Sequence, residues 1–178
     1  MVDREAAVSP VIGVILLLAI VIILAALVAS FAGGAADLKD PPPSVDLAVY
    51  SAGSGNDFTL VFEHRGGDQV LLRDLRINTW VHLPDSEQRP ASYDLRRELE
   101  KDEPLKFIKN FGDSDVPGVW RAGGGSNTGG LGDTAGFLNL DKMELEDCIK
   151  RSAVVEVAIY HLPSGALLYK SSVLLKER

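Results

Sequence analysis

The sequence of 178 residues contains little of what many binding and catalytic sites are built from. Its single cysteine, Cys148, excludes an internal disulfide framework and any zinc site with several cysteines. Acidic side chains outnumber basic ones, 25 against 18, which argues against a nucleic-acid partner because phosphate binding needs clustered Lys and Arg. The chain also lacks an Asn-x-Ser/Thr triplet, so N-linked glycosylation has no standard acceptor.

Charge is absent from a long stretch near the N-terminus, between Ala6 and Ala36. The first 36 residues hold only Asp3, Arg4 and Glu5, a net −1, so residues 37–178 carry −6 of the total −7. Residues 11–31 are almost wholly aliphatic, and a helix over them would span roughly 30 Å, about the thickness of bilayer hydrocarbon. Because apolar residues surround it on all sides, the sequence predicts a membrane helix.

The ends of the apolar run suggest its fate and its orientation. Secretory signal peptides usually have an apolar stretch of about 7–15 residues, so this longer run favours a helix that stays attached, as a simple single-pass anchor would. Arg4 precedes the helix and the acidic bulk follows it, which places the N-terminus in the cytoplasm and the rest outside.

The residues around the start of this helix are specific. The block AVSPVIGVILLLAIVIILAALVASF resembles the N-terminal segment of archaeal type IV pilins, with a class III signal peptide. The resemblance implies that a prepilin peptidase removes a leader of residues 1–6, cutting after Ala6 or, as the near competitor, after Ala7. It implies a processing site formed by Glu5, Ala6 and Ala7. It also implies a filament-core helix over residues 7–36, in which the residues expected to matter are Pro10, Val11, Gly13, Leu18, Leu24 and Phe31.

The remainder reads as a spacer and a separate head. Gly33-Gly34 should end the helix, and residues 37–44, with three prolines, should form a hinge and spacer. Residues 45–178 predict a β-rich extracellular domain, an antiparallel all-β sandwich (Ig-like), so that the whole chain is α+β. The expected strands are 45–50, 58–64, 70–79, 137–140, and a hairpin of 154–161 and 166–174; residues 94–103 could form a short helix, and 112–133 a loop. The turn His64-Arg65-Gly66-Gly67-Asp68 is similar to one in archaeal pilin heads.

Candidate chemical sites are weak. Residues 130–135 match G-x-G-x-x-A, but a glycine-rich loop before and an expected strand after argue against dinucleotide binding. The histidines, His64, His82 and His161, are scattered, and Asp68 and the acidic residues at 113–115 extend into no recognised calcium loop. We therefore expect no catalytic residue, metal or cofactor, and no enzyme.

Two classes of function remain. The resemblance implies a structural subunit of an archaeal adhesion pilus, which lies in the cell membrane before assembly and in an extracellular filament afterwards. Its partners would be identical subunits, the prepilin peptidase, an assembly ATPase, a membrane platform protein and, before assembly, lipid. The alternative is a membrane-tethered binding domain or minor pilin-like subunit that forms no main filament. An archaellin of a rotating filament is a closer variant of the pilus subunit, but the Val-Ser-Pro-Val-Ile-Gly opening fits adhesive pilins better.

Overall fold

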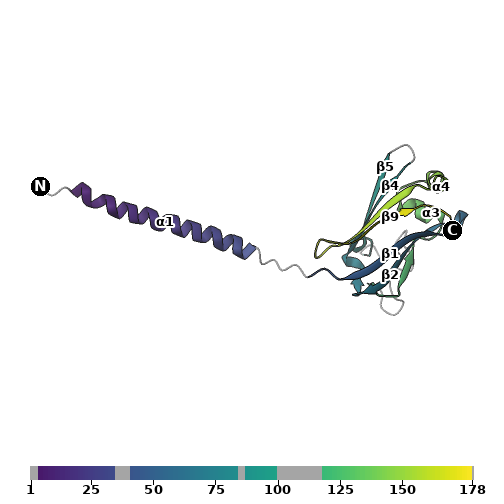
Figure 1. Cartoon of the computed structure of the whole chain (residues 1–178), viewed down its shortest axis with the longest axis horizontal. Helices are drawn as coiled ribbons and strands as arrows, with labels where there is room; N and C mark the ends of the chain where they lie inside the picture. Colours follow the sequence, from purple (N-terminus) through teal and green to yellow (C-terminus); the bar gives the residue numbers. More distant parts are fainter. Residues whose placement is uncertain (1–3, 35–40, 84–86, 100–117, 178) are drawn as a thin grey trace. The chain divides into compact units, whose positions relative to one another are not determined.

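The computed structural model describes residues 4–34, 41–83, 87–99 and 118–177. The chain divides into two compact units, Met1–Lys39 and Asp40–Arg178. A single long helix, α1 (Arg4–Gly34), makes up the described part of the first unit, and the described part of the second contains antiparallel sheets and short helices (Figure 1). The predicted fold class, α+β with a long apolar helix before antiparallel sheets, is confirmed.

Helix α1 ends where the sequence predicts, at the glycine pair that closes the apolar run. Its first residue, Arg4, precedes the predicted leader boundary, so the helix extends further toward the N-terminus than residues 7–36. Residues 35–40, which include half of the predicted spacer, lie outside the described residues. The second unit, called the head below, begins without regular structure at residues 41–44.

A three-stranded sheet in the order β1-β2-β7 forms one layer of the head. Strands β1 (Val45–Ala52) and β2 (Thr59–Gly67) pair antiparallel around a short 3-10 turn, η1 (Gly55–Asp57), and β7 (Gly125–Asn127) adds a short edge. Buried and partly exposed residues alternate along β2, as expected for a strand with one face in the core. The predicted strands 45–50 and 58–64 are thus confirmed.

A four-stranded sheet in the order β5-β4-β8-β9 forms the other layer. Its strands are β4 (Leu75–His82), β5 (Gln88–Asp94), β8 (Val154–His161) and β9 (Ala166–Leu174). The last two form the predicted hairpin, with the predicted bounds, around residues 162–165. A separate two-stranded ladder joins β3 (Val70–Leu71) and β6 (Val119–Trp120).

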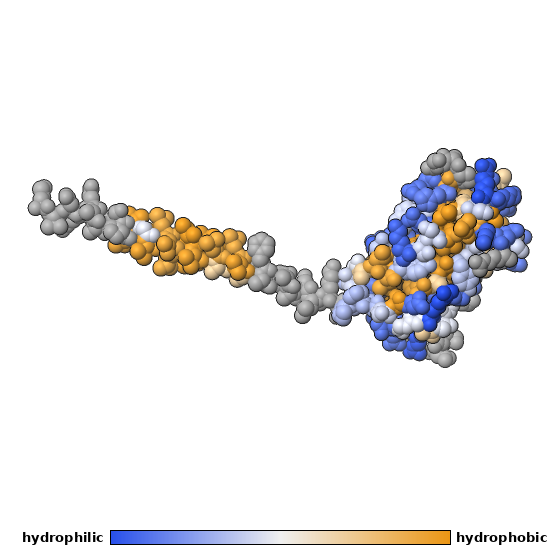
Figure 2. Space-filling view, in the orientation of Figure 1, coloured by the Kyte–Doolittle hydropathy of each residue, from blue (hydrophilic) through white to orange (hydrophobic). Residues whose placement is uncertain are grey.

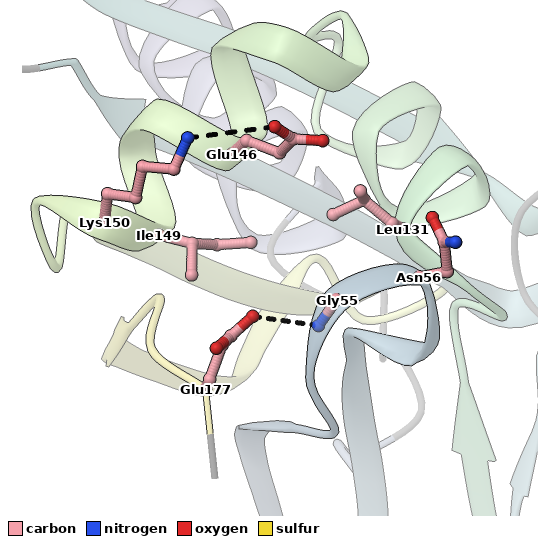
Figure 3. Close-up of a pocket in the computed structure, with 7 residues that line it drawn as sticks. All are labelled: Gly55, Asn56, Leu131, Glu146, Ile149, Lys150 and Glu177. Carbon is pink, nitrogen blue, oxygen red and sulfur yellow. Dashed lines mark hydrogen bonds and ion pairs between the residues drawn. The ribbon is translucent and has the colours of Figure 1, made fainter.

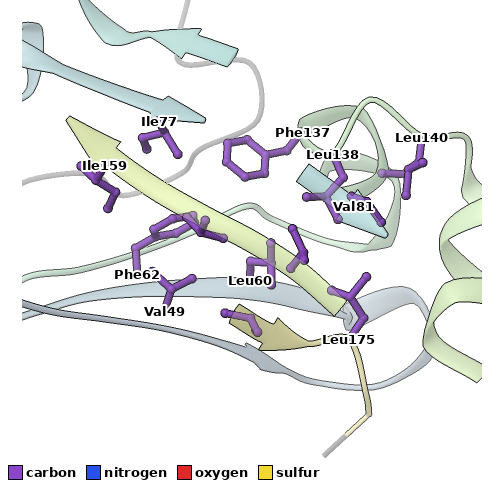
Figure 4. Packing of buried hydrophobic residues seen from close by; sticks show 14 of the residues in the cluster. Val49, Leu60, Phe62, Ile77, Val81, Phe137, Leu138, Leu140, Ile159 and Leu175 are labelled. Atoms are coloured by element: carbon purple, nitrogen blue, oxygen red, sulfur yellow. The ribbon is translucent and has the colours of Figure 1, made fainter. Parts of the chain in front are cut away.

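The hydrophobic core fills the space between the two layers and reaches the helices at one end (Figure 4). Phe62 of β2 contacts Phe137 edge to face, with ring centroids 5.8 Å apart, and Tyr93 of β5 stacks on the same ring at 4.8 Å. Phe137 therefore ties both sheets to the helical end. The helices there are α3 (Leu131–Phe137) and α4 (Lys142–Lys150); α2 (Leu95–Leu99) follows β5.

Three expectations need correction. The strand predicted at 70–79 is interrupted by a 3-10 turn, η2 (Leu72–Asp74), because β3 pairs with β6 whereas β4 pairs with β5 and β8. Residues 137–140 are not a strand: α3 ends there, and Asn139 has a φ of 56°, which no strand residue adopts. Short strands and α3 occupy part of the predicted loop at 112–133, so short helices accompany the antiparallel sheets of the head.

Side chains join the edge strands of the two sheets, β1 and β9. The Val49 N–H donates to the Tyr169 hydroxyl oxygen at 3.1 Å. The Ser51 hydroxyl lies 2.9 Å from the Leu174 carbonyl oxygen and 3.0 Å from that of Lys176, both within donating distance. These contacts occupy part of the edges of both sheets. Because unpaired edges invite association with other chains, they also leave less edge open to such association.

This junction predicts a stability effect at Ser51, which is 3% exposed. Replacing it in Ser51→Ala removes the donor that two carbonyl groups share, and should lower the free energy of unfolding by about 1–3 kcal/mol. Ser172→Ala, at an exposed position of β9, is the control and should change it by less than about 0.5 kcal/mol. Denaturant unfolding, followed by tryptophan fluorescence, measures the free energy of unfolding of both variants. A loss in Ser51→Ala no larger than that in Ser172→Ala would show that the junction contributes nothing to stability.

Candidate functional site

The most distinctive surface of the first unit is that of α1, which is apolar on all sides of the helix. Residues Val11–Ser30 form a stretch long and apolar enough to cross a membrane, and none of it is buried (Figure 2). Leu17 and Val28 are each 67% exposed although they lie in different turns of the helix. Such a helix is stable only when lipid or other apolar helices cover it.

The sequence-predicted site residues all lie on α1. Leu18 and Leu24, near the middle, are 56% and 55% exposed, and Val11 is similarly open. Space around Gly13 is open, because a Cβ added there would have no heavy atom within 4 Å. The backbone is helical at the remaining predicted positions, which are Glu5, Ala6, Ala7, Pro10 and Phe31.

The start of the head is held by the predicted Gly-Gly-Asp turn. The Ser44 N–H donates to Asp68 Oδ2 at 2.9 Å, and the Asp68 N–H donates back to the Ser44 carbonyl oxygen at 2.8 Å. His64, which is buried, donates through Nε2 to the Asp68 carbonyl oxygen at 2.9 Å and packs edge-on against Trp120. This arrangement fixes the chain to the sheet immediately after Pro41-Pro42-Pro43. The sequence could not predict the role of Ser44.

Gly67 allows this close approach. Its φ is +98°, a conformation that side chains other than glycine rarely adopt, and a Cβ there would collide with the Ser44 carbonyl oxygen. The neighbouring Gly66 has an ordinary φ and open space around it. The second glycine of the turn is therefore the one that the contact with Ser44 requires.

A pocket of about 460 Å³ opens on the head between η1, α4 and the C-terminal segment (Figure 3). Its charged side chains are already paired: Lys150 Nζ lies 3.9 Å from Glu146 Oε2, and the Gly55 N–H donates to Glu177 Oε1 at 2.8 Å. Sequence reasoning did not anticipate this pocket. The paired charges leave no obvious nucleophile or general base among its described lining residues, which also include Asn56, Leu131 and Ile149.

The other chemical candidates are separated in space. Among the residues that the structure describes, no three His, Cys, Asp or Glu side chains cluster as metal ligands would. His82 pairs with Glu156 at 3.5 Å, and His161 Nδ1 lies 2.8 Å from the Ser164 hydroxyl, at the other end of β4 and β8. Cys148 is fully buried in α4. The acidic residues 113–115 lie outside the described residues.

The glycine motif at 130–135 was misjudged in one respect: it follows a short strand, β7, and opens a helix, α3. In a dinucleotide-binding unit a parallel strand would come next. Here α4 follows α3, and β8 then pairs antiparallel with both of its neighbours. The described topology is therefore not that of a dinucleotide-binding unit.

The outer surfaces of the sheets carry paired charges. Lys170 Nζ lies 3.2 Å from Glu156 Oε2, and this contact, together with His82, lowers the pKa of Glu156. The Tyr50 hydroxyl donates to Glu63 Oε1 at 2.5 Å and lowers the pKa of Glu63. Both carboxylates therefore stay ionised at neutral pH, which keeps these surfaces hydrophilic.

Comparison with known proteins agrees with the properties of α1. Residues 6–47 match the family described as archaeal type IV pilin, N-terminal. The N-terminal segment is therefore similar to that of archaeal type IV pilins. The chain is also 42% identical over 74 residues to an uncharacterized protein of Archaeoglobus fulgidus, an alignment that covers 41% of this chain and 51% of the relative. The match thus spans about half the length of that relative.

The pilin match covers α1 from residue 6 onward, the predicted spacer and the first residues of β1. Over these residues the chain is similar to archaeal type IV pilins, and α1 is long and apolar enough to cross a membrane. Most of the head lies beyond the matched residues.

The contact between Gly67 and Ser44 predicts that two adjacent glycines differ in tolerance. Gly67→Ala should lower the free energy of unfolding of the head by about 2 kcal/mol or more, because of its left-handed φ and the steric conflict. Gly66→Ala, the matched control, should change it by about 0.5 kcal/mol at most. Thermal unfolding of the detergent-solubilised chain, read from near-ultraviolet circular dichroism, measures both. Equal losses would contradict the proposed importance of this turn.

Proposed function

We propose that this protein is a structural subunit of an archaeal type IV adhesion pilus. The observation that carries the proposal is the uncovered apolar helix, Val11–Ser30, within a segment that matches the pilin family. Twenty helical residues at 1.5 Å each span roughly 30 Å, which suits the bilayer before assembly. In this state the N-terminus is cytoplasmic and the head lies outside the cell.

Removal of the leader by a prepilin peptidase, after Ala6 or Ala7, prepares the helix for assembly. The helix then leaves the bilayer and packs against identical helices in a filament core, so that apolar contacts between subunits replace contacts with lipid. An assembly ATPase and a membrane platform protein drive this transfer. Small residues such as Gly13 and Ala19 allow neighbouring helices to approach closely.

The heads form the filament surface, where they attach cells to surfaces. Three properties support this role: a core independent of α1, a negative net charge, and ionised surface carboxylates such as Glu63 and Glu156. In this proposal the leader comprises residues 1–6, the core helix residues 7–36, the spacer residues 37–44 and the head residues 45–178. The role requires no cofactor, metal or catalytic residue.

Assembly through α1 predicts that a charge within the helix blocks filament formation while the head still folds. Leu18→Asp should abolish filaments, because a charge at the centre of a membrane helix costs about 2.5–3.5 kcal/mol. Leu167→Asp is the matched control: Leu167 is 49% exposed in β9, close to the 56% of Leu18, and its replacement should leave filaments intact. Electron microscopy counts the filaments, and membrane-fraction levels of each variant check insertion.

The milder variant Leu24→Ala separates a filament core from a simple tether. Losing a packed leucine side chain costs roughly 2–5 kcal/mol in protein cores, and every subunit repeats the loss. Filaments should therefore become fewer or shorter while the variant remains in the membrane. Normal filaments from cells that contain only Leu18→Asp would contradict assembly through α1.

A further inference from the structure

The predicted cleavage bonds lie inside a helix, because α1 begins at Arg4 and continues through Pro10. In an α-helix the N–H of each residue donates to the carbonyl oxygen four residues earlier. A peptide bond held in this way must be exposed by local opening before a peptidase can cut it, and the ease of opening controls the rate. The helical precursor therefore needs a weak point near its leader boundary.

Pro10 supplies this weak point at a defined carbonyl. Proline has no N–H, so the carbonyl group four residues earlier, which here belongs to Ala6, has no helical donor. Pro10 is the one proline in the sequence of α1, so no other carbonyl in that helix loses its donor for this reason. The Ala7 carbonyl, in the competing cleavage bond, has the N–H of Val11 as its helical donor.

We infer that Pro10 is a positioning residue for leader removal and directs the cut to the Ala6–Ala7 bond rather than to Ala7–Val8. The inference rests on the proposed processing of this chain by a prepilin peptidase. In the hydrolysis, the oxygen of a water molecule bonds to the Ala6 carbonyl carbon and the bond from that carbon to the Ala7 nitrogen breaks. Ala6 ends the leader as a carboxyl group, and the proton goes to the new amine of Ala7.

The same residue does no harm to the product. After this cut Pro10 is the fourth residue of the mature chain, and the first four N–H groups of a helix have no partner within it. The hydrogen bond that proline lacks is therefore missing only in the precursor. After a cut behind Ala7, Pro10 would likewise lie among the first four residues of the helix, where no hydrogen bond is lost. The stability of the product therefore does not distinguish the Ala6–Ala7 bond from the Ala7–Val8 bond. What distinguishes them is whether the carbonyl group in the bond to be cut has a helical donor.

The test exchanges two adjacent residues without changing the composition. In the double variant Pro10→Val with Val11→Pro, the carbonyl without a donor is that of Ala7 instead of Ala6. The full chain and the variant are each produced in cells that contain the prepilin peptidase, and the mature proteins are weighed by mass spectrometry. We expect the natural chain to start at Ala7 and the variant to start at Val8, one alanine residue lighter.

A single variant, Pro10→Ala, tests the rate. Restoring the N–H should slow cleavage of the Ala6–Ala7 bond roughly two- to tenfold, the equilibrium effect of one backbone hydrogen bond. Membrane-fraction levels show that both variants are inserted. An exchange variant cut after Ala6 or left uncut, or a natural chain cut after Ala7, would overturn the inference while leaving processing itself in place. A natural chain that retains its leader would contradict the proposed function as well.

Discussion

The exposed surface of α1 is the constraint on which the behaviour of the whole protein depends. Fourteen Val, Leu and Ile side chains between Val11 and Val28 are at least half exposed. At about 1.5 kcal/mol for each side chain, a low value for complete burial, their exposure to water costs on the order of 20 kcal/mol. Since a domain is stable by only about 5–15 kcal/mol, no head domain could offset this cost. The helix must be covered; in the proposed function lipid covers it first and copies of itself cover it afterwards.

The head solves a different problem, because it buries its own apolar residues. Phe62, Phe137 and Tyr93 join the two sheets and the helical end, and Ser51 joins the edge strands. Reciprocal hydrogen bonds between Ser44 and Asp68 fix the point at which the chain enters the sheet. The head therefore has a core separate from α1 and can remain folded whether lipid or other subunits cover the helix.

Sequence patterns predicted those parts of the fold that depend on local periodicity. The alternation around Phe58, Leu60 and Phe62 identified β2, and the residues around Pro163 identified the hairpin of β8 and β9. The run at residues 137–140 was misread as a strand because a short apolar run has the same composition at a buried helix end. Pairing of Ser44 with Asp68 could not be predicted, since these residues meet only in the tertiary structure. The candidate site on α1 could be predicted from the sequence because it lies within one continuous segment.

Purified surface filaments offer the most direct measurement of the central claim. Electron microscopy of the filaments, combined with N-terminal sequencing of their subunit, determines whether this chain is present and where it begins. We predict filaments built from this chain, with Ala7 as the first residue and α1 packed in the core. Filaments without this chain, or a subunit that begins after residue 36 and so lacks the helix, would contradict assembly through α1.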